Sequence, residues 1–143
     1  MAEPTRVTIL ADTGPLYALV DRKDAWHERV AAWWQSAPRS VLVPVTVLPE
    51  VSHLLLTRIG SRAEQAFIRA VADGEFTTES LEPDDIDRAA SLMSQYDNLP
   101  LGFVDATVIA IAERLAVRGI LTTDRKHFSI VQPLHAKRFV LSP

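Results

Sequence analysis

The sequence predicts a three-layer α/β sandwich built around a parallel sheet. Short apolar runs typical of buried strands alternate with longer segments whose apolar residues recur at helical spacing. This alternation favours β-α-β units, which place parallel strands in one sheet and helices on both of its faces. The 143 residues contain no repeat and no linker-like segment, so we expect a single domain over residues 1–143.

Apolar runs, and the glycine and proline residues that follow them, predict the first strands and helices. The run Val-Thr-Ile-Leu-Ala at 7–11 is typical of a buried strand, and Gly14-Pro15 opens a helix, because proline is tolerated in a first helical turn. An amphipathic helix is expected around 24–36 and a second strand at 41–45.

The middle of the chain predicts two helices, an edge strand and a third helix. The helices cover about 47–59 and 62–73, and each stops near a glycine. Residues 75–81 alternate like a short edge strand. The next helix, to about residue 96, is opened by Pro83 and two aspartates, which suit the positive end of a helix dipole.

The last third of the chain predicts an apolar helix and two strands. The helix covers 103–118, and Gly119 is expected to end it. Short strands are then expected at 120–123 and 138–141.

Four carboxylates fall where these elements meet one edge of the sheet. Asp12 ends the first strand, and Asp124 follows the fourth. Glu50 and Asp105 lie near the starts of helices. Ligands of parallel sheets bind outside the carboxyl ends of the strands, so we expect these four side chains to lie close together.

Each carboxylate also has an ordinary structural explanation. Asp12 and Asp124 suit helix caps or turns, and Glu50 and Asp105 suit the first turns of helices, whose dipoles favour acids. Four anions within several ångströms repel one another, however, unless a cation or protons intervene. Together they predict a site for Mg²⁺ or Mn²⁺ that hydrolyses phosphate esters. Without metal, we expect a raised pKa for at least one of these carboxyls.

Hydroxyl and basic side chains lie next to the four acids. Thr13 and Thr122 either supply hydroxyls to the carboxylates and metal-bound water or satisfy local backbone groups. Arg125 and Lys126 directly follow the last acid and either contact a phosphate backbone or form a solvated basic turn. Setting the four acids aside changes the formal net charge from −3 to +1, so the remaining surface is not acidic.

Composition narrows the class of protein. The chain has no cysteine, which excludes disulfides, thiolate zinc sites and cysteine nucleophiles and fits a reducing compartment. No apolar run approaches the ~18 residues of a membrane span, and the first residues lack the basic and hydrophobic segments of a signal peptide. We therefore expect a cytoplasmic protein.

Four segments resemble, in order and spacing, the acidic motifs of PIN-domain ribonucleases, most closely the VapC group of bacterial toxin–antitoxin toxins. The segments are ILADTGPLYALVD, VPVTVLPEVSHLL, LGFVDATVIAIAERL and ILTTDRKHF. The resemblance implies a five-stranded parallel sheet, Mg²⁺- or Mn²⁺-dependent RNA cleavage, inhibition by a cognate antitoxin, and a homodimer.

The resemblance also implies the roles of particular residues. It makes Asp12, Glu50, Asp105 and Asp124 the catalytic acids, with Thr13 and Thr122 as supporting hydroxyls. In the mechanism that we expect, Asp12, Asp105 and Asp124 bind Mg²⁺, while Glu50 orients or deprotonates the attacking water.

Three other functions stay open. The poorest fit is a phospho-acceptor switch protein, which needs paired acids near the end of the first strand, whereas Asp12 is followed by Thr13 and Gly14. A metal-free ribonuclease would use the RNA 2′-hydroxyl as nucleophile and would work in EDTA. A catalytically silent PIN-like module would only bind RNA or protein, although such a module is expected to lack one or more of the acids, and all four are present.

Three tryptophans fall on one predicted helix. Trp26, Val30, Trp33 and Trp34 line up at helical spacing, which is usual for core residues. Because three tryptophans are many for one short helix, part of this stripe is alternatively an apolar groove for a partner helix.

Overall fold

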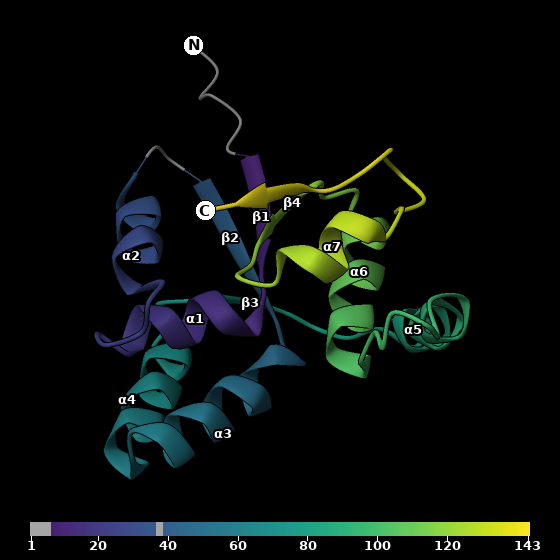
Figure 1. The fold of residues 1–143 in the computed structure, drawn as a ribbon. Helices are drawn as coiled ribbons and strands as arrows, with labels where there is room; N and C mark the ends of the chain where they lie inside the picture. The colour runs from purple at the N-terminus through teal and green to yellow at the C-terminus, as the bar shows by residue number, and fades with distance from the viewer. Residues whose placement is uncertain (1–6, 37–38) are drawn as a thin grey trace.

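A computed structural model describes residues 7–36 and 39–143 and contains one five-stranded, all-parallel sheet. The strand order is β3-β2-β1-β4-β5 (Figure 1). The strands are β1 (Val7–Ala11), β2 (Arg39–Pro44), β3 (Thr77–Glu79), β4 (Gly119–Leu121) and β5 (Val140–Ser142). The predicted fold class, a three-layer α/β sandwich around a parallel sheet of about five strands, is confirmed.

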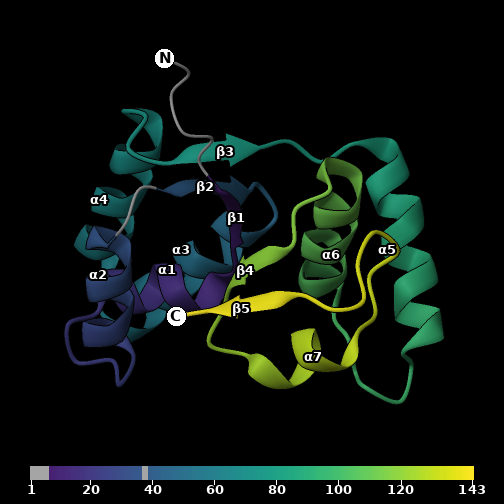
Figure 2. The same cartoon turned by 90° about the horizontal axis from the view of Figure 1, so that it is seen from above.

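Helices cover both faces of the sheet. Figure 2 shows α1 to α4 on one side and α5 and α6 on the other, with α7 beside β5. The helices are α1 (Thr13–Val20), α2 (His27–Gln35), α3 (Val47–Arg58), α4 (Ser61–Ala72), α5 (Pro83–Gln95), α6 (Phe103–Leu115) and α7 (Arg125–Ile130). Across the described ranges, none of the helices is long and apolar enough to cross a membrane.

The core lies on both faces of the central strands. Leu10 of β1 and Ile120 of β4 are fully inaccessible to solvent. Helix α6 contributes an unbroken buried run, Ala106 to Ala112. A parallel strand covered on both faces reads as a continuous apolar run, which is why β1 and β4 are recognisable in the sequence.

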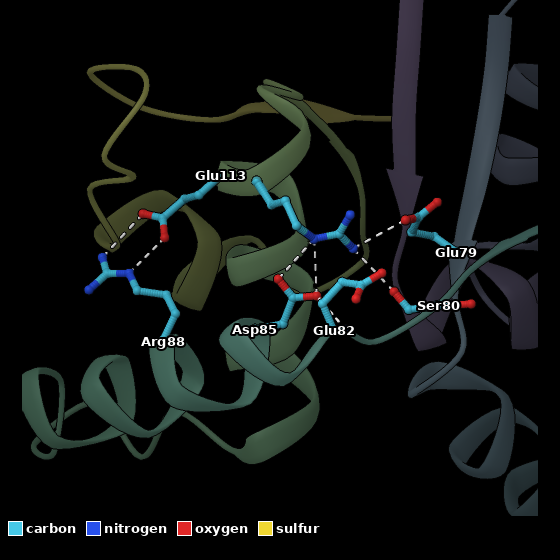
Figure 3. A network of polar contacts seen from close by, with 7 residues as sticks. Glu79, Ser80, Glu82, Asp85, Arg88 and Glu113 are labelled. Carbon is cyan, nitrogen blue, oxygen red and sulfur yellow. Dashed lines mark hydrogen bonds and ion pairs between the residues drawn. The ribbon is translucent and has the colours of Figure 1, made fainter.

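A network of ion pairs joins α5 and α6 to the end of β3 (Figure 3). The Arg114 side chain donates to Asp85 and Glu79, each at 3.1 Å. Arg88 donates to Glu113 at 2.7 Å. Asp85 is almost fully buried and also accepts from the backbone N–H of Glu82, so one carboxylate both caps α5 and binds α6.

Most predicted boundaries differ from the observed ones by one to three residues, the role predicted for Gly119 was wrong, and one helix was missed. Helix α6 ends at Leu115, because Ala116 takes the left-handed conformation (φ 55°). Gly119 does not end the helix but begins β4, where a Cβ atom would lie 3.2 Å from Cγ1 of Ile9 on β1. Residues 125–130 form the short helix α7, which the sequence did not predict, so Arg125 and Lys126 lie on a helix and not in a basic turn, which was one of their two interpretations.

The tryptophan stripe on α2 lies partly in the core. Val30 is fully buried, and Trp33 and Trp34 are half-buried against the core. Trp34 packs edge-on against Phe76 at 5.7 Å between ring centroids. The guanidinium of Arg39 lies 4.4 Å from the ring centroid of Trp33. The core interpretation therefore accounts for Trp34, and a groove for a partner stays a prediction.

Candidate metal centre

The strand order places Asp12 and Asp124 at the same edge of the sheet. Strands β1 and β4 are neighbours, with Ala11 paired to Leu121, so the residues after them leave the sheet side by side. The backbone N–H of Asp12 continues the ladder and donates to the carbonyl of Leu121 at 2.9 Å. The predicted shared edge is confirmed for these two acids.

Asp12 is buried, with 6% of its surface exposed, and does not cap α1 with its side chain. Instead, the hydroxyl of Thr122 donates to Oδ2 of Asp12 at 3.0 Å. The same hydroxyl accepts from the backbone N–H of Asp124 at 2.9 Å. Thr122 therefore links two of the four predicted acids, which is the supporting contact expected of it.

Thr13, the first residue of α1, brings a second hydroxyl to Glu50. Thr13 donates to Oε1 of Glu50, an exposed residue at the start of α3, at 3.3 Å. Gly14 permits the close approach of the start of α1 to the segment after β4, since a Cβ atom on Gly14 would clash with Oγ1 of Thr123. The glycine therefore serves the packing of two site-bearing segments.

His127 is a site residue that the sequence analysis missed. Its Nδ1 lies 2.7 Å from Oδ2 of Asp124 and 3.3 Å from Oδ2 of Asp105. Possible ligand atoms of Asp105, Asp124 and His127 all lie within 4.8 Å of one another. Asp124 also caps α7, since it accepts from the backbone N–H of His127, so its cap function and its place in the cluster coexist.

The four carboxylates act on one another electrostatically. Burial, with the charges of Asp105 and Glu50, raises the pKa of Asp12 to about 7, against hydrogen bonds from Thr122 and the backbone of Thr13. Burial, together with the charges of Asp124 and Glu50, also raises the pKa of Asp105, and His127 opposes this. The expected raised pKa is confirmed, although burial contributes more than repulsion.

The two basic residues that follow Asp124 are not paired with the cluster acids in the described residues. Arg125 and Lys126 are exposed, and the guanidinium of Arg125 donates to the carbonyl oxygen of Pro143. In the described part of the chain, neither side chain forms an ion pair with a cluster acid. Their predicted contact with substrate phosphate stays a prediction.

The donor set suits a hard divalent cation. Asp105, Asp124 and His127 offer two carboxylates and one imidazole within 4.8 Å of one another, and the chain has no thiolate. Among the groups that shift the pKa of Asp12 and Asp105 most, none is a lysine or arginine. The negative charge is therefore largely uncompensated by the protein itself, which is the condition under which a bound cation stabilises the fold.

Comparisons with known proteins agree with this fold. The family model described as PIN domain matches residues 9–132. Ribonuclease VapC26 of Mycobacterium tuberculosis (strain ATCC 25618 / H37Rv) is 32% identical over 135 residues, which cover 94% of this chain and all of the relative.

Solved structures of related folds align over most of the chain. The crystal structure of Mycobacterium tuberculosis VapC20, described as a sarcin-ricin loop cleaving toxin, aligns with a TM-score of 0.80 and 27% identity, covering 90% of this chain and 98% of VapC20. A toxin–antitoxin complex from Klebsiella pneumoniae aligns with a TM-score of 0.64 and 18% identity, covering 92% and 99%, which shows the fold alone.

Proposed function

Since the chain belongs to the PIN-domain family, in its VapC group, we propose that it is a metal-dependent endoribonuclease toxin that hydrolyses RNA phosphodiester bonds. The observation that carries this proposal is the group of Asp105, Asp124 and His127, whose possible ligand atoms lie within 4.8 Å of one another, beside Asp12, whose pKa the charges of Asp105 and Glu50 help to raise. Raised values are expected where anions converge without a matching cation.

Asp12, Asp105 and Asp124 are the residues that would hold Mg²⁺, for which Mn²⁺ substitutes. Thr122 fixes Asp12, and His127 fixes the other two, so both sides of the cluster are oriented by hydrogen bonds. When bound, the ion supplies positive charge to the phosphate oxygens as negative charge develops on them. Arg125 and Lys126 would contact phosphates next to the cleaved one.

We assign Glu50 a role other than metal binding, because its side chain is exposed and accepts a hydrogen bond from Thr13. A carboxylate that accepts one hydrogen bond keeps further lone pairs free. Glu50 therefore orients or deprotonates the water that attacks phosphorus, while Thr13 holds its carboxylate towards the cluster.

The VapC membership supports a protein partner as well as an RNA substrate. We expect a cognate antitoxin that inhibits the activity, and a homodimer of this chain. The half-buried tryptophans of α2 are the candidate contact for the antitoxin, because large amphipathic rings are enriched at protein interfaces.

The test uses the purified protein and end-labelled RNA of several sequences. Cleavage with Mg²⁺ and with Mn²⁺, loss of cleavage in EDTA, and loss of cleavage in Asp12→Asn and Asp105→Asn support the proposal. Cleavage in EDTA that leaves 2′,3′-cyclic phosphate ends would instead indicate a metal-free ribonuclease. RNA binding without cleavage under every condition would indicate a silent binding module.

A further inference from the structure

A second charged site lies at the opposite end of β4 from the carboxylates. Arg118, Lys137 and Arg138, with His135 and Ala136, line a cavity of about 410 Å³. We call this cavity the basic pocket. It contains no acidic side chain and no large apolar side chain among its lining residues.

The backbone holds the lining residues in place. Arg118 directly precedes β4, and its carbonyl accepts from the backbone N–H of Val140, the first residue of β5, at 2.8 Å. On the other wall, Nε2 of His135 bonds to the carbonyl of Val117 at 2.7 Å. The loop that leads into β5, yellow in Figure 2, is therefore tied at two points to the segment that directly precedes β4.

Buried aromatic packing fixes the same loop from beneath. Phe139 is buried and packs edge-on against Phe128 and His135, at 6.3 and 6.0 Å between ring centroids. A loop anchored in this way loses little additional backbone freedom when a ligand binds, so the backbone that carries the charged side chains is preorganised.

In the described part of the chain, the three cations of the basic pocket have no counterion. Within residues 7–36 and 39–143, no side-chain hydrogen bond or ion pair involves Arg118, Lys137 or Arg138. Arg88 and Arg114, by contrast, are both paired with carboxylates. Three like charges around one hollow repel one another, and an anion that enters it relieves the repulsion.

The basic pocket and the candidate metal centre are two separate sites. Arg118 lies just before β4 and Thr122 just after it. Four residues of extended chain span roughly 13 Å. This distance is on the order of four nucleotides of stacked strand, at about 3.4 Å for each.

We propose that the basic pocket binds backbone phosphates of the RNA substrate, several nucleotides away from the phosphodiester that is cleaved. The inference rests on the proposed ribonuclease function. Guanidinium groups bind phosphate through paired hydrogen bonds, and the pocket offers two of them beside an ammonium group. An acidic helix of a protein partner would need apolar anchor contacts, which the lining residues do not supply.

The test compares two triple variants in which the same charge is removed. The first is Arg118→Gln/Lys137→Gln/Arg138→Gln. The matched control is Arg22→Gln/Lys23→Gln/Arg62→Gln, which removes three exposed cations from the α1–α2 connection and α4, on the other side of the sheet. Both are made in the full chain with intact acids and in the Asp105→Asn background. Thermal melts verify folding. If the triple variant has a lower melting temperature than the wild type, the measurement is repeated with the single variant Lys137→Glu, which changes one exposed loop residue.

Binding of a fluorescent 15-nucleotide RNA is measured in EDTA by anisotropy over a range of salt. We expect the pocket variant to bind at least tenfold more weakly than the control at about 0.1 M salt, with a salt slope reduced by about 2, since each single-strand phosphate contact contributes about 0.7. Cleavage of a trinucleotide, which is too short to reach the pocket, is expected to be unchanged.

The outcomes separate this inference from the proposed function. Equal RNA binding by the pocket variant and the control overturns the basic pocket, even if metal-dependent cleavage is present. Weaker binding by the pocket variant without any cleavage by the intact chain overturns the proposed function and keeps the pocket. Unchanged RNA binding with loss of binding to the antitoxin would show that the pocket takes a protein partner instead, which also overturns the inference.

Discussion

The hydroxyl of Thr122 donates to Oδ2 of Asp12 at 3.0 Å, although the two residues are 110 positions apart in the chain. This contact links the residues that follow β1 and β4. It also favours the ionised form of the Asp12 carboxylate, because it lowers the pKa that burial raises. Metal binding requires ionised ligands. We therefore expect the buried hydroxyl of Thr122 to influence how tightly the proposed centre binds a metal ion.

Thr122→Val removes this donor with little change in volume. We expect Mn²⁺ affinity to fall about tenfold or more, as for other residues that orient metal ligands. Titration calorimetry with Mn²⁺ measures the affinity, and RNA cleavage is expected to fall with it. Thr122→Ser keeps the hydroxyl and serves as the control. Equal affinities of the two variants would show that the hydroxyl has no such effect.

Asp105→Asn is expected to stabilise the protein in EDTA. The raised pKa of Asp105 means that its ionised form is less favourable in the fold than in the unfolded chain, despite the contact with His127. At pH 8 the melting temperature of the variant should exceed that of the wild type by a few degrees. Excess Mn²⁺ should stabilise the wild type more than the variant, because it binds the native state. A less stable variant in EDTA, with equal responses to Mn²⁺, would identify Asp105 as an ordinary helix-terminal acid.

Asp12 is expected to make the metal-free protein less stable as the pH rises. Its pKa is raised from 3.8 to about 7, so between these values the folded protein holds a proton that the unfolded chain has released. The difference in unfolding free energy between the wild type and Asp12→Asn should therefore shift against the wild type from pH 4 to pH 7 and level off above this range. Urea titrations in EDTA at several pH values measure it. A pH-independent difference would contradict the raised pKa.

Arg114→Met is expected to destabilise the protein by about 3 kcal/mol, because it leaves the buried Asp85 without its ion-pair partner. The control is Arg69→Met, which breaks an exposed pair with Asp73 on one helix and should cost less than about 1 kcal/mol. Urea unfolding compares the two. Similar losses would mean that the network in Figure 3 adds nothing beyond a surface ion pair.

Trp34 of α2 and Trp26, the residue before α2, are expected to differ in their effect on stability. Trp34→Ala should cost about 3 kcal/mol, since the ring packs on Phe76 and on the core. Trp26→Ala should cost about 1 kcal/mol or less, because its ring is paired mainly with Arg29. If Trp34→Ala instead leaves stability unchanged and weakens antitoxin binding, the groove interpretation of the stripe is correct.

The parts of the site that follow from the order of elements were predictable from the sequence. Parallel strands that end in Asp12 and Asp124 must deliver both residues to one edge, whatever the loops do. His127 was missed for a local reason. Its helix α7 has only six residues, too few to show helical periodicity, so Asp-Arg-Lys-His read as a turn.

Gly119 shows a different limit of sequence reasoning. A glycine after an apolar helix is typical of a helix end, and the pattern carries no sign that Ile9, far away in the chain, requires the space. The contacts of Arg114 with Asp85 and Glu79 are equally invisible, because charged residues on an exposed-looking helix face predict no particular partner. Long-range contacts of single side chains depend on packing that periodicity does not encode.

The sheet order has a consequence for the sequence of events in which the carboxylate cluster assembles during synthesis. The ribosome delivers Asp12 and Glu50 well before β4, which joins the sheet beside β1 only after residue 121 has emerged. Thr122, Asp124 and His127 follow β4 in the chain and emerge later still. A nascent polypeptide that has exposed β1 to α6 therefore holds Asp12, Glu50 and Asp105 without the hydroxyl and the imidazole that orient them, and the candidate metal centre is completed only when β4 docks beside β1.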